Sequence, residues 1–243
     1  EITAHPAVKE GNIKLAFQVI AQKGLETLAV KRASIWLYIE QGKRVRCTSV
    51  VQEDSHEHAE GTILDTEMYP IYFRTLERER IIPAQDALND PRTKELAFTL
   101  FKPMGIQSVM DVSIRQGNKP VGIMSFEYSN GKREWTLDEQ SFATSLTDTI
   151  SLVLEQKERQ LNSQLRQAYA QLEEANREML RQKQAIEEAT HDLSNSIKYA
   201  KRIQTNILPS KDYLDRCLGK DNYFIVHRQR DTVGSDFYWF EQV

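Results

Sequence analysis

The spacing of apolar residues divides the chain into three zones. In residues 1–150, short apolar segments alternate with clusters of Gly, Asn and Asp, a pattern typical of strands and helices joined by turns. From about residue 154 to residue 207, apolar residues recur at steps of three and four, which predicts a long helix with one apolar stripe. Pro209 ends that pattern, and residues 209–243 begin a new arrangement.

The first zone predicts an antiparallel sheet of five or six strands with helices on its faces, an α/β fold of the α+β kind. Two hairpins are expected, because each pair of apolar segments flanks a short polar turn that contains Gly. The expected elements are a helix at 6–28, strands at 33–40 and 45–51, a helix at 69–79, a strand at 81–82, a turn at 86–92, a helix at 94–101, and strands at 109–114 and 121–128.

The second zone, residues 151–208, reads as a signalling helix that pairs with another helix. A capping box at Thr136 and Glu139 predicts where the helix begins. Residues 154–207 would span about 80 Å at ~1.5 Å per residue, too long to bury the stripe alone. We expect a parallel homodimer, while a solvated single helix and an antiparallel hairpin stay open. One side of the expected dimer seam consists of Leu165, Leu172, Met179, Ile186 and Leu193.

The other side of the seam contains small and polar residues in its middle, from Ala168 through Gln182 to Ser196. Such residues lower the stability of a coiled coil and can hold its register. The weak seam either allows the helix to transmit a conformational change or is simply tolerated.

Composition narrows the possible partners. The net charge of -3 gives no general attraction to nucleic acid or to an anionic membrane, so neither is expected as a partner. Two distant cysteines, Cys47 and Cys217, suit a reducing cytoplasm rather than a disulfide framework. No apolar run reaches the ~20 residues that cross a bilayer. The chain opens without an initiator Met, so we expect it to be part of a longer protein.

Several segments in order resemble the GAF domains of bacterial signalling proteins: residues 33–38, 69–73, 86–93, 105–112 and 135–142. The resemblance identifies residues 1–150 as a GAF-type sensor domain. Its pocket is expected between the sheet and residues 63–106, with Asp86, Arg92 and Asp111 as polar candidates, although each could simply brace a turn. The ligand is unknown: the segment 61–107 has no cysteine for a bilin, and no cyclic-nucleotide signature is evident.

Residues 196–239 resemble the entry to a PPM-type, SpoIIE-like serine/threonine phosphatase, on the strength of segments 199–209 and 230–239. The resemblance implies Mg²⁺ or Mn²⁺ in the complete domain, with Asp236 as one metal ligand. Family members more often place Gly directly before this Asp, whereas Ser235 stands there. It also implies that sensor output reaches the phosphatase near Arg202, Ile203, Ile207 and Leu208. The other metal carboxylates would follow Val243, so residues 209–243 are expected to be a truncated start without catalytic residues or cofactor.

Together these features predict a homodimeric sensor that controls a phosphatase acting on a phosphoprotein. Two rivals stay open. The first is a dimerisation scaffold whose GAF domain binds no ligand. The second is the sensor part of a histidine kinase, because His191 and Asp192 resemble a phospho-acceptor pair on a dimerising helix. Against the kinase, the residues after this pair lack the usual proline, and no ATP-binding signature follows.

Overall fold

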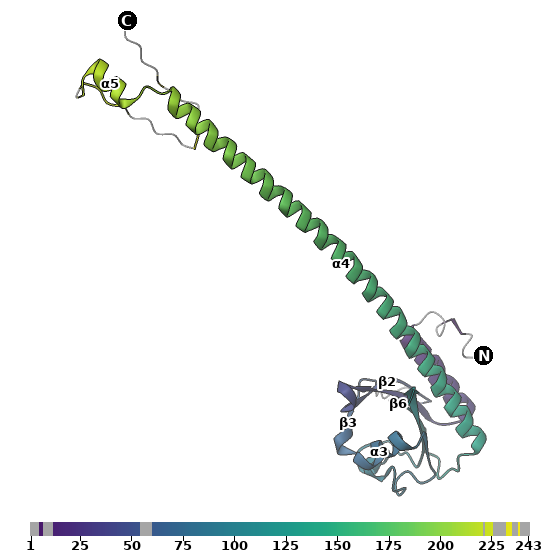
Figure 1. Ribbon diagram of the computed structural model, residues 1–243. Coiled ribbons are helices and arrows are strands. Elements are labelled where there is room, and N and C mark those ends of the chain that lie inside the picture. The colour runs from purple at the N-terminus through teal and green to yellow at the C-terminus, as the bar shows by residue number, and fades with distance from the viewer. Residues whose placement is uncertain are drawn as a thin grey trace. The chain divides into compact units, whose positions relative to one another are not determined.

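Six strands form one antiparallel sheet in the order β3-β2-β1-β6-β5-β4 (Figure 1). The computed structural model describes residues 5–6, 12–53, 60–220, 222–225, 232–234 and 238. The chain divides into two units, Glu1–Gln164 and Leu165–Val243, and the sheet belongs to the first. The strands are β1 Arg32–Ile39, β2 Arg44–Gln52, β3 Ile63–Asp65, β4 Ile81–Ala84, β5 Ser108–Gln116 and β6 Lys119–Tyr128.

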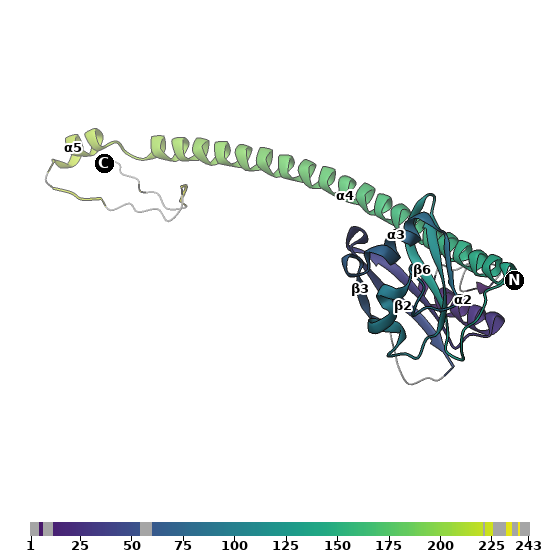
Figure 2. The same cartoon turned by 90° about the horizontal axis from the view of Figure 1, so that it is seen from below.

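Both faces of this sheet are buried, because successive side chains of a strand point to opposite sides. On one face, Ala33 and Ile35 pack with helix α2 (Ile13–Leu28) and the start of helix α4 (Leu137–Ile207). On the other face, Trp36 packs with helix α3 (Pro70–Arg78). Figure 2 shows α2 beside the first turns of α4 on one side of the sheet. The predicted fold class, a sheet flanked by helices and followed by a long helix, is confirmed.

The helix expected at 6–28 is interrupted at Asn12: Pro6 is helical, residues 7–11 lie outside the described residues, and α2 begins at Ile13. Asn12 has a non-helical backbone, and its side chain accepts a hydrogen bond of 3.2 Å from the backbone N–H of Leu15. An Asn in this position satisfies a helical N–H that has no partner within the helix, and so sets the first turn.

Two further local expectations need correction. Residues 94–101 are helical as expected, but they form a 3₁₀ turn, η4 (Lys94–Leu96), followed by a single wide π turn, η5 (Ala97–Phe101), and not one regular α-helix. Strand β3 was not expected, because its three residues are too few to show an alternating pattern. It pairs with β2 at the edge of the sheet.

Helix α4 runs for 71 residues, and its start confirms the predicted capping box. Thr136 N–H donates to Glu139 Oε2 at 2.8 Å, and Glu139 N–H donates to Thr136 Oγ1 at 3.3 Å. Each residue thus satisfies the other's backbone N–H. The first turns are part of the domain core, where Leu146, Ile150 and Val153 are buried against the sheet.

In the second unit, α4 ends at Ile207 and a short helix, α5 (Lys211–Leu218), begins after Ser210 caps it. The apolar run 223–226 favours a strand, but residues 223–225 have no regular secondary structure, and Val226 lies outside the described residues. No strand in the described part of this unit is available to pair with them. None of the helices within the described part of the chain has the length and apolar content needed to cross a membrane.

Candidate functional site

A cluster of buried polar side chains lies on the sheet face that α3 covers. In the strand register, Arg32 of β1 stands opposite Glu127 of β6, and Asp111 of β5 stands opposite Ser125 of β6. Because residues two apart on a strand share a face, these four side chains point to the same side. Tyr72 of α3 meets them from above, and all five are at most 6% exposed.

Arg32 and Glu127 form a buried ion pair within this cluster. Arg32 Nη1 lies 2.5 Å from Glu127 Oε2, and both side chains are almost fully removed from solvent. Burial raises the pKa of Glu127, while the Arg32 guanidinium acts in the opposite direction. The charge of each partner is therefore balanced by the other, as a buried ion pair requires.

Asp111 has no such cationic partner. Its Oδ2 accepts a hydrogen bond of 2.8 Å from the hydroxyl of Tyr72, and Ser125 provides a second side-chain hydrogen bond. Its Oδ1 is buried without a partner. Burial disfavours the charged form and raises the pKa of this carboxyl to about 7, although the hydrogen bonds from Ser125 and Tyr72 oppose the shift. Asp111 thus changes its charge near neutral pH.

A closed cavity of about 20 Å³ lies between this polar floor and α3. That volume is close to the space one water molecule needs. On the sheet side the cavity is lined by carboxyl and hydroxyl groups, and elsewhere mainly by aromatic rings and aliphatic side chains. The lining residues are Trp36, Val45, Leu64, Tyr72, Phe73, Leu96, Leu100, Phe101, Asp111, Ile123, Ser125 and Glu127.

Helix α3 is held over the cavity by side chains at both of its ends. Glu95 Oε2 accepts hydrogen bonds of 2.9 Å from the backbone N–H groups of Ile71 and Tyr72. At the other end, Arg115 donates to the carbonyl oxygens of Leu76 and Glu77 at 3.0 and 2.9 Å. An anion at the first turn and a cation at the last both complement the helix dipole. The Tyr72 hydroxyl is therefore positioned by residues far from it in sequence.

The structure separates the three pocket residues that the sequence suggested. Asp111 lines the cavity, whereas Asp86 and Arg92 line a depression of about 400 Å³ on the surface. Asp86 pairs with Lys132 at 2.6 Å, and this contact, together with a hydrogen bond from Asn89, lowers the pKa of the partly exposed Asp86 carboxyl. Arg92 pairs with Asp90 at 2.8 Å. These contacts give Asp86 and Arg92 roles in holding the turn.

Sequence reasoning missed Arg32, Tyr72 and Glu127. One signal was present: in β6, Ser125 and Glu127 alternate with the apolar Met124 and Phe126, which places polar groups at every second position of a buried strand. The partners of Glu127 could not be found in this way, because Arg32 lies 95 positions away in the sequence and only the strand register brings them together.

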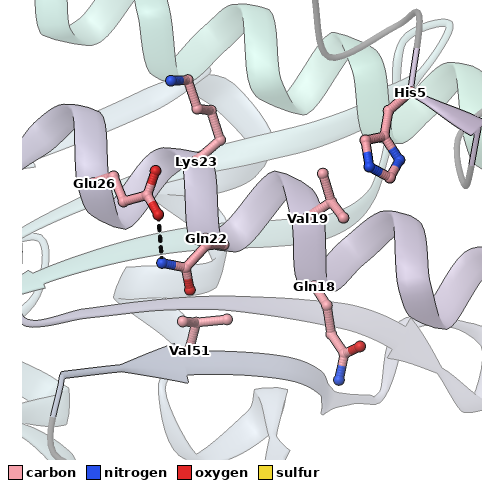
Figure 3. Close-up of a pocket in the computed structure, with 7 residues that line it drawn as sticks. All are labelled: His5, Gln18, Val19, Gln22, Lys23, Glu26 and Val51. Atoms are coloured by element: carbon pink, nitrogen blue, oxygen red, sulfur yellow. Dashed lines mark hydrogen bonds between the residues drawn. The ribbon is translucent and has the colours of Figure 1, made fainter.

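A larger groove of about 620 Å³ lies on the outer side of α2 (Figure 3). It is open and lined by exposed polar side chains and two half-buried valines. The one hydrogen bond drawn between them joins Gln22 Nε2 to Glu26 Oε1 at 2.7 Å, between exposed side chains of the same helix. The groove gathers no buried polar groups, so the closed cavity is the stronger candidate. Its lining is His5, Gln18, Val19, Gln22, Lys23, Glu26 and Val51.

The residues expected to form the dimer seam are exposed along α4. Leu165, Leu172, Met179, Ile186 and Leu193 retain 50–66% of their accessible surface. Leu193 also lines a shallow groove with Ile197 and Thr232.

The expected coupling residues lie at the end of the same helix. Arg202, Ile203 and Ile207 are exposed in the last turns of α4, and Leu208 follows its end, partly buried. Asp236, the expected metal ligand, lies outside the described residues. Among the residues that the structure does describe, no group of three or more His, Cys, Asp or Glu side chains is placed to hold a metal ion.

Solved structures resemble the first unit. The GAF domain of PixJ from Thermosynechococcus elongatus is 16% identical, with a TM-score of 0.55 over 66% of this chain and 94% of that one. The GAF domain of a phosphoenolpyruvate-protein phosphotransferase from Coxiella burnetii is 16% identical, with a TM-score of 0.53 over 65% and 89%. A far-red-absorbing dark state with bound biliverdin IXa is 14% identical, with a TM-score of 0.53 over 63% and 95%.

At these identities the structural likeness shows the fold alone. Comparison with curated proteins gave no match. The sequence does match the GAF domain family over residues 12–154, more than half of its 243 residues. GAF domains are sensor domains typical of signalling proteins. The chain therefore belongs to the GAF domain family.

Proposed function

We propose that this chain is the sensing and dimerising part of a bacterial signalling protein, in which the GAF domain controls a metal-dependent serine/threonine phosphatase through a parallel coiled coil. The observation that carries the proposal is that α4 belongs to the GAF core at its start and extends far beyond the domain. Its first turns are buried in the GAF core, at Leu146, Ile150 and Val153, and the same unbroken helix continues for some fifty residues beyond them.

Beyond residue 160 the helix presents a stripe of large apolar side chains to solvent. An exposed contiguous apolar surface of this kind is typical of an interaction site. A second copy of the same helix would cover it, because the seam residues recur every seven positions. The exposed side chains on or beside the seam are Leu161, Leu165, Tyr169, Leu172, Met179, Ile186, Leu193, Ile197, Tyr199, Ile203 and Ile207.

The output half of the proposal depends on the resemblance of segments 199–209 and 230–239 to PPM-type phosphatases. Two divalent ions in such a domain would supply a nucleophilic water for attack on a phosphoserine or phosphothreonine of a partner protein. Asp236 would be one carboxylate ligand, and a single carboxylate does not make a two-metal site. We therefore assign no catalytic step to the residues of this chain.

The cavity at Asp111 is the proposed sensing site. A buried carboxyl with an unpartnered oxygen is costly unless an occupant or a proton satisfies it. A bilin such as the biliverdin of one relative is not proposed, because about 20 Å³ is far too small for it and Cys47 does not line the cavity.

The same small volume favours a second candidate function, a dimerisation scaffold whose GAF domain binds no ligand. Native mass spectrometry of freshly purified protein and calorimetry with a metabolite panel separate the two. A bound small molecule supports the sensor, whereas an empty domain that binds nothing in the panel supports the scaffold.

The dimer is tested by sedimentation equilibrium of the chain and of two variants that each gain one negative charge. Leu172→Glu places the charge in the seam and should make the chain monomeric. Gln184→Glu adds the same charge on the opposite side of the helix and should leave a dimer. A parent chain that sediments as a monomer at micromolar concentration would refute the proposed coiled coil.

The phosphatase assignment is tested on the longest natural form of the protein. We expect Mn²⁺-dependent release of phosphate from a phosphoserine substrate, abolished by Asp236→Asn. Acid-labile phosphate on His191, without any phosphatase activity, would instead support the histidine kinase alternative.

A further inference from the structure

The middle of α4 contains a polar side chain in the apolar stripe. Gln182 lies three residues after Met179 and four before Ile186, so it occupies a seam position. Its Nε2 donates a hydrogen bond of 3.3 Å to Glu178 Oε1, one turn earlier on the helix. Gln182 is therefore already linked to a charged residue that flanks the seam.

The positions that flank the seam carry few charges. In heptad notation, with Met179 at a and Gln182 at d, the flanking e and g positions from 161 to 207 hold three charged residues, Glu178, Lys183 and Asp192. The others are neutral or apolar: Asn162, Gln164, Tyr169, Gln171, Asn176, Ala185, Thr190, Ile197, Tyr199, Gln204 and Asn206.

Glu178 and Lys183 are five residues apart, at a g position and at the next e position. In a parallel coiled coil, side chains with this spacing meet between the two helices. Two symmetric ion pairs, Glu178 of each copy with Lys183 of the other, would then enclose the layers of Met179 and Gln182. Asp192 has no such counterpart, because Ile197 stands five residues after it.

We propose that Glu178, Gln182 and Lys183 form a register-setting layer that selects a second copy of this chain in parallel, with identical residues side by side. This inference rests on the proposed dimerisation and adds its direction and register. Each Gln182 amide would bond the other across the seam while keeping its hydrogen bond to Glu178, and each Glu178 would meet Lys183 of the second copy.

Other alignments lose these contacts. A shift of one heptad places Gln182 against Ala175 or Ala189, which offer no side-chain partner to a buried amide. An antiparallel pair places Gln182 against the other side of the seam, which carries residues such as Met179 and Ile186. In both cases the ion pair between Glu178 of one copy and Lys183 of the other is also lost.

Within a single chain these charges have only weak and exposed partners. Lys183 Nζ lies 3.8 Å from Glu187 Oε1, and Arg181 Nη1 lies 3.8 Å from Glu178 Oε2. The side chains of Glu178 and Lys183 are 55% and 70% exposed. They can therefore turn toward a second helix without breaking a buried contact.

The test is charge reversal, read out as the dissociation constant of the full chain by sedimentation. Glu178→Lys and Lys183→Glu should each weaken the dimer by about tenfold, since two attractive pairs become repulsive. The double variant, Glu178→Lys with Lys183→Glu, should recover most of the parent affinity, because the ion pairs between the helices re-form with reversed sign and only the hydrogen bond from Gln182 to Glu178 is lost. Glu174→Lys makes the same charge change away from the flanks and is the matched control.

Register is read separately by disulfide formation in a Cys217→Ser background, where the remaining Cys47 is buried. Ala168→Cys should form a homodimeric disulfide, and its yield should fall when Gln182→Leu and Glu178→Lys are added while the chain remains a dimer.

Three outcomes separate the two proposals. A parent dimer that is equally stable with Glu178→Lys, or that fails to recover in the double variant, overturns the register layer and leaves the dimer standing. An Ala168→Cys disulfide yield that does not change when Gln182→Leu and Glu178→Lys are added likewise overturns the register layer and leaves the dimer standing. A monomeric parent overturns both proposals.

Discussion

The hydroxyl of Tyr72 donates a hydrogen bond of 2.8 Å to Oδ2 of Asp111 and so joins helix α3 to strand β5 beside the closed cavity. Both residues are almost fully buried. The pKa of Asp111 lies near 7, because burial outweighs the two hydrogen bonds that favour the charged form. The contact between α3 and the sheet therefore includes a buried carboxyl with a raised pKa.

The first prediction concerns the pH dependence of stability. The pKa of Asp111 is raised in the folded state, so its contribution to stability is fully present below about pH 4, its unfolded pKa, and is lost as pH rises through about 7. The free energy of unfolding should fall over this range by at most about 1.4 kcal/mol per pH unit. Urea unfolding followed by tryptophan fluorescence measures the slope.

Asp111→Asn is the control for this slope. Asn cannot ionise but can still accept the Tyr72 hydrogen bond, so the variant should lose the part of the slope that Asp111 causes. Glu127 also has a raised pKa, so it contributes to the pH slope of the unfolding free energy with the same sign in the parent and in the variant. A variant whose slope equals that of the parent would show that Asp111 does not titrate in this range.

The second prediction concerns the Tyr72 hydroxyl. Tyr72→Phe leaves Asp111 Oδ2 without this donor and should cost about 1–2 kcal/mol in the free energy of unfolding. Because the lost hydrogen bond lowered the pKa of Asp111, that pKa should rise further and move the pH transition upward. Tyr69→Phe removes a hydroxyl bonded to Thr99 instead, and should leave the pH transition in place.

The third prediction concerns the cap of α3. Glu95→Ala removes the acceptor for the backbone N–H groups of Ile71 and Tyr72, and should destabilise the domain by about 1 kcal/mol. Glu95→Gln keeps an oxygen acceptor and should recover most of that loss. Equal unfolding free energies for both variants and the parent would argue against the cap.

The fourth prediction concerns the close contact of β1 and β6 at Gly122. A Cβ atom at this position would lie 2.4 Å from the carbonyl oxygen of Trp36, which belongs to the neighbouring backbone and cannot turn away. Gly122→Ala should therefore destabilise the domain by about 2 kcal/mol or more. Gly117→Ala, at a turn with φ +59° and open space around it, should cost about 1 kcal/mol from backbone strain. Chemical unfolding of both variants ranks them.

Local patterns predicted most of the fold. The hairpin of β1 and β2, the hairpin of β5 and β6, and the capping box at Thr136 depend on residues close in sequence, so they were visible without the structure. Strand β3 and the π turn at Ala97–Phe101 depend on what surrounds them, and sequence reasoning did not find them.

The candidate site was predicted only in part. The polar candidates were Asp86, Arg92 and Asp111, all taken from the resemblance to GAF domains. Asp111 lines the cavity, whereas Asp86 and Arg92 form ion pairs at the surface. Polar residues that stabilise a turn and polar residues that line a pocket look alike in a sequence. The Arg32–Glu127 pair required the register of β1 against β6, which alternating apolar residues do not specify.

Strand β6 separates the two cores of the domain, and it is tightly held on the side away from the cavity. Ser125 and Glu127 line the cavity, whereas Phe126, between them, faces α2. A Cβ atom on Gly24 would lie 2.6 Å from Cε1 of Phe126, so the ring rests directly on the helix backbone. An occupant that pushed β6 toward α2 would press Phe126 against this helix and toward Leu146 of α4, which also lies close to Gly24. A small displacement of β6 at the cavity would thus reach the helices on the opposite face of the sheet through the Phe126 ring.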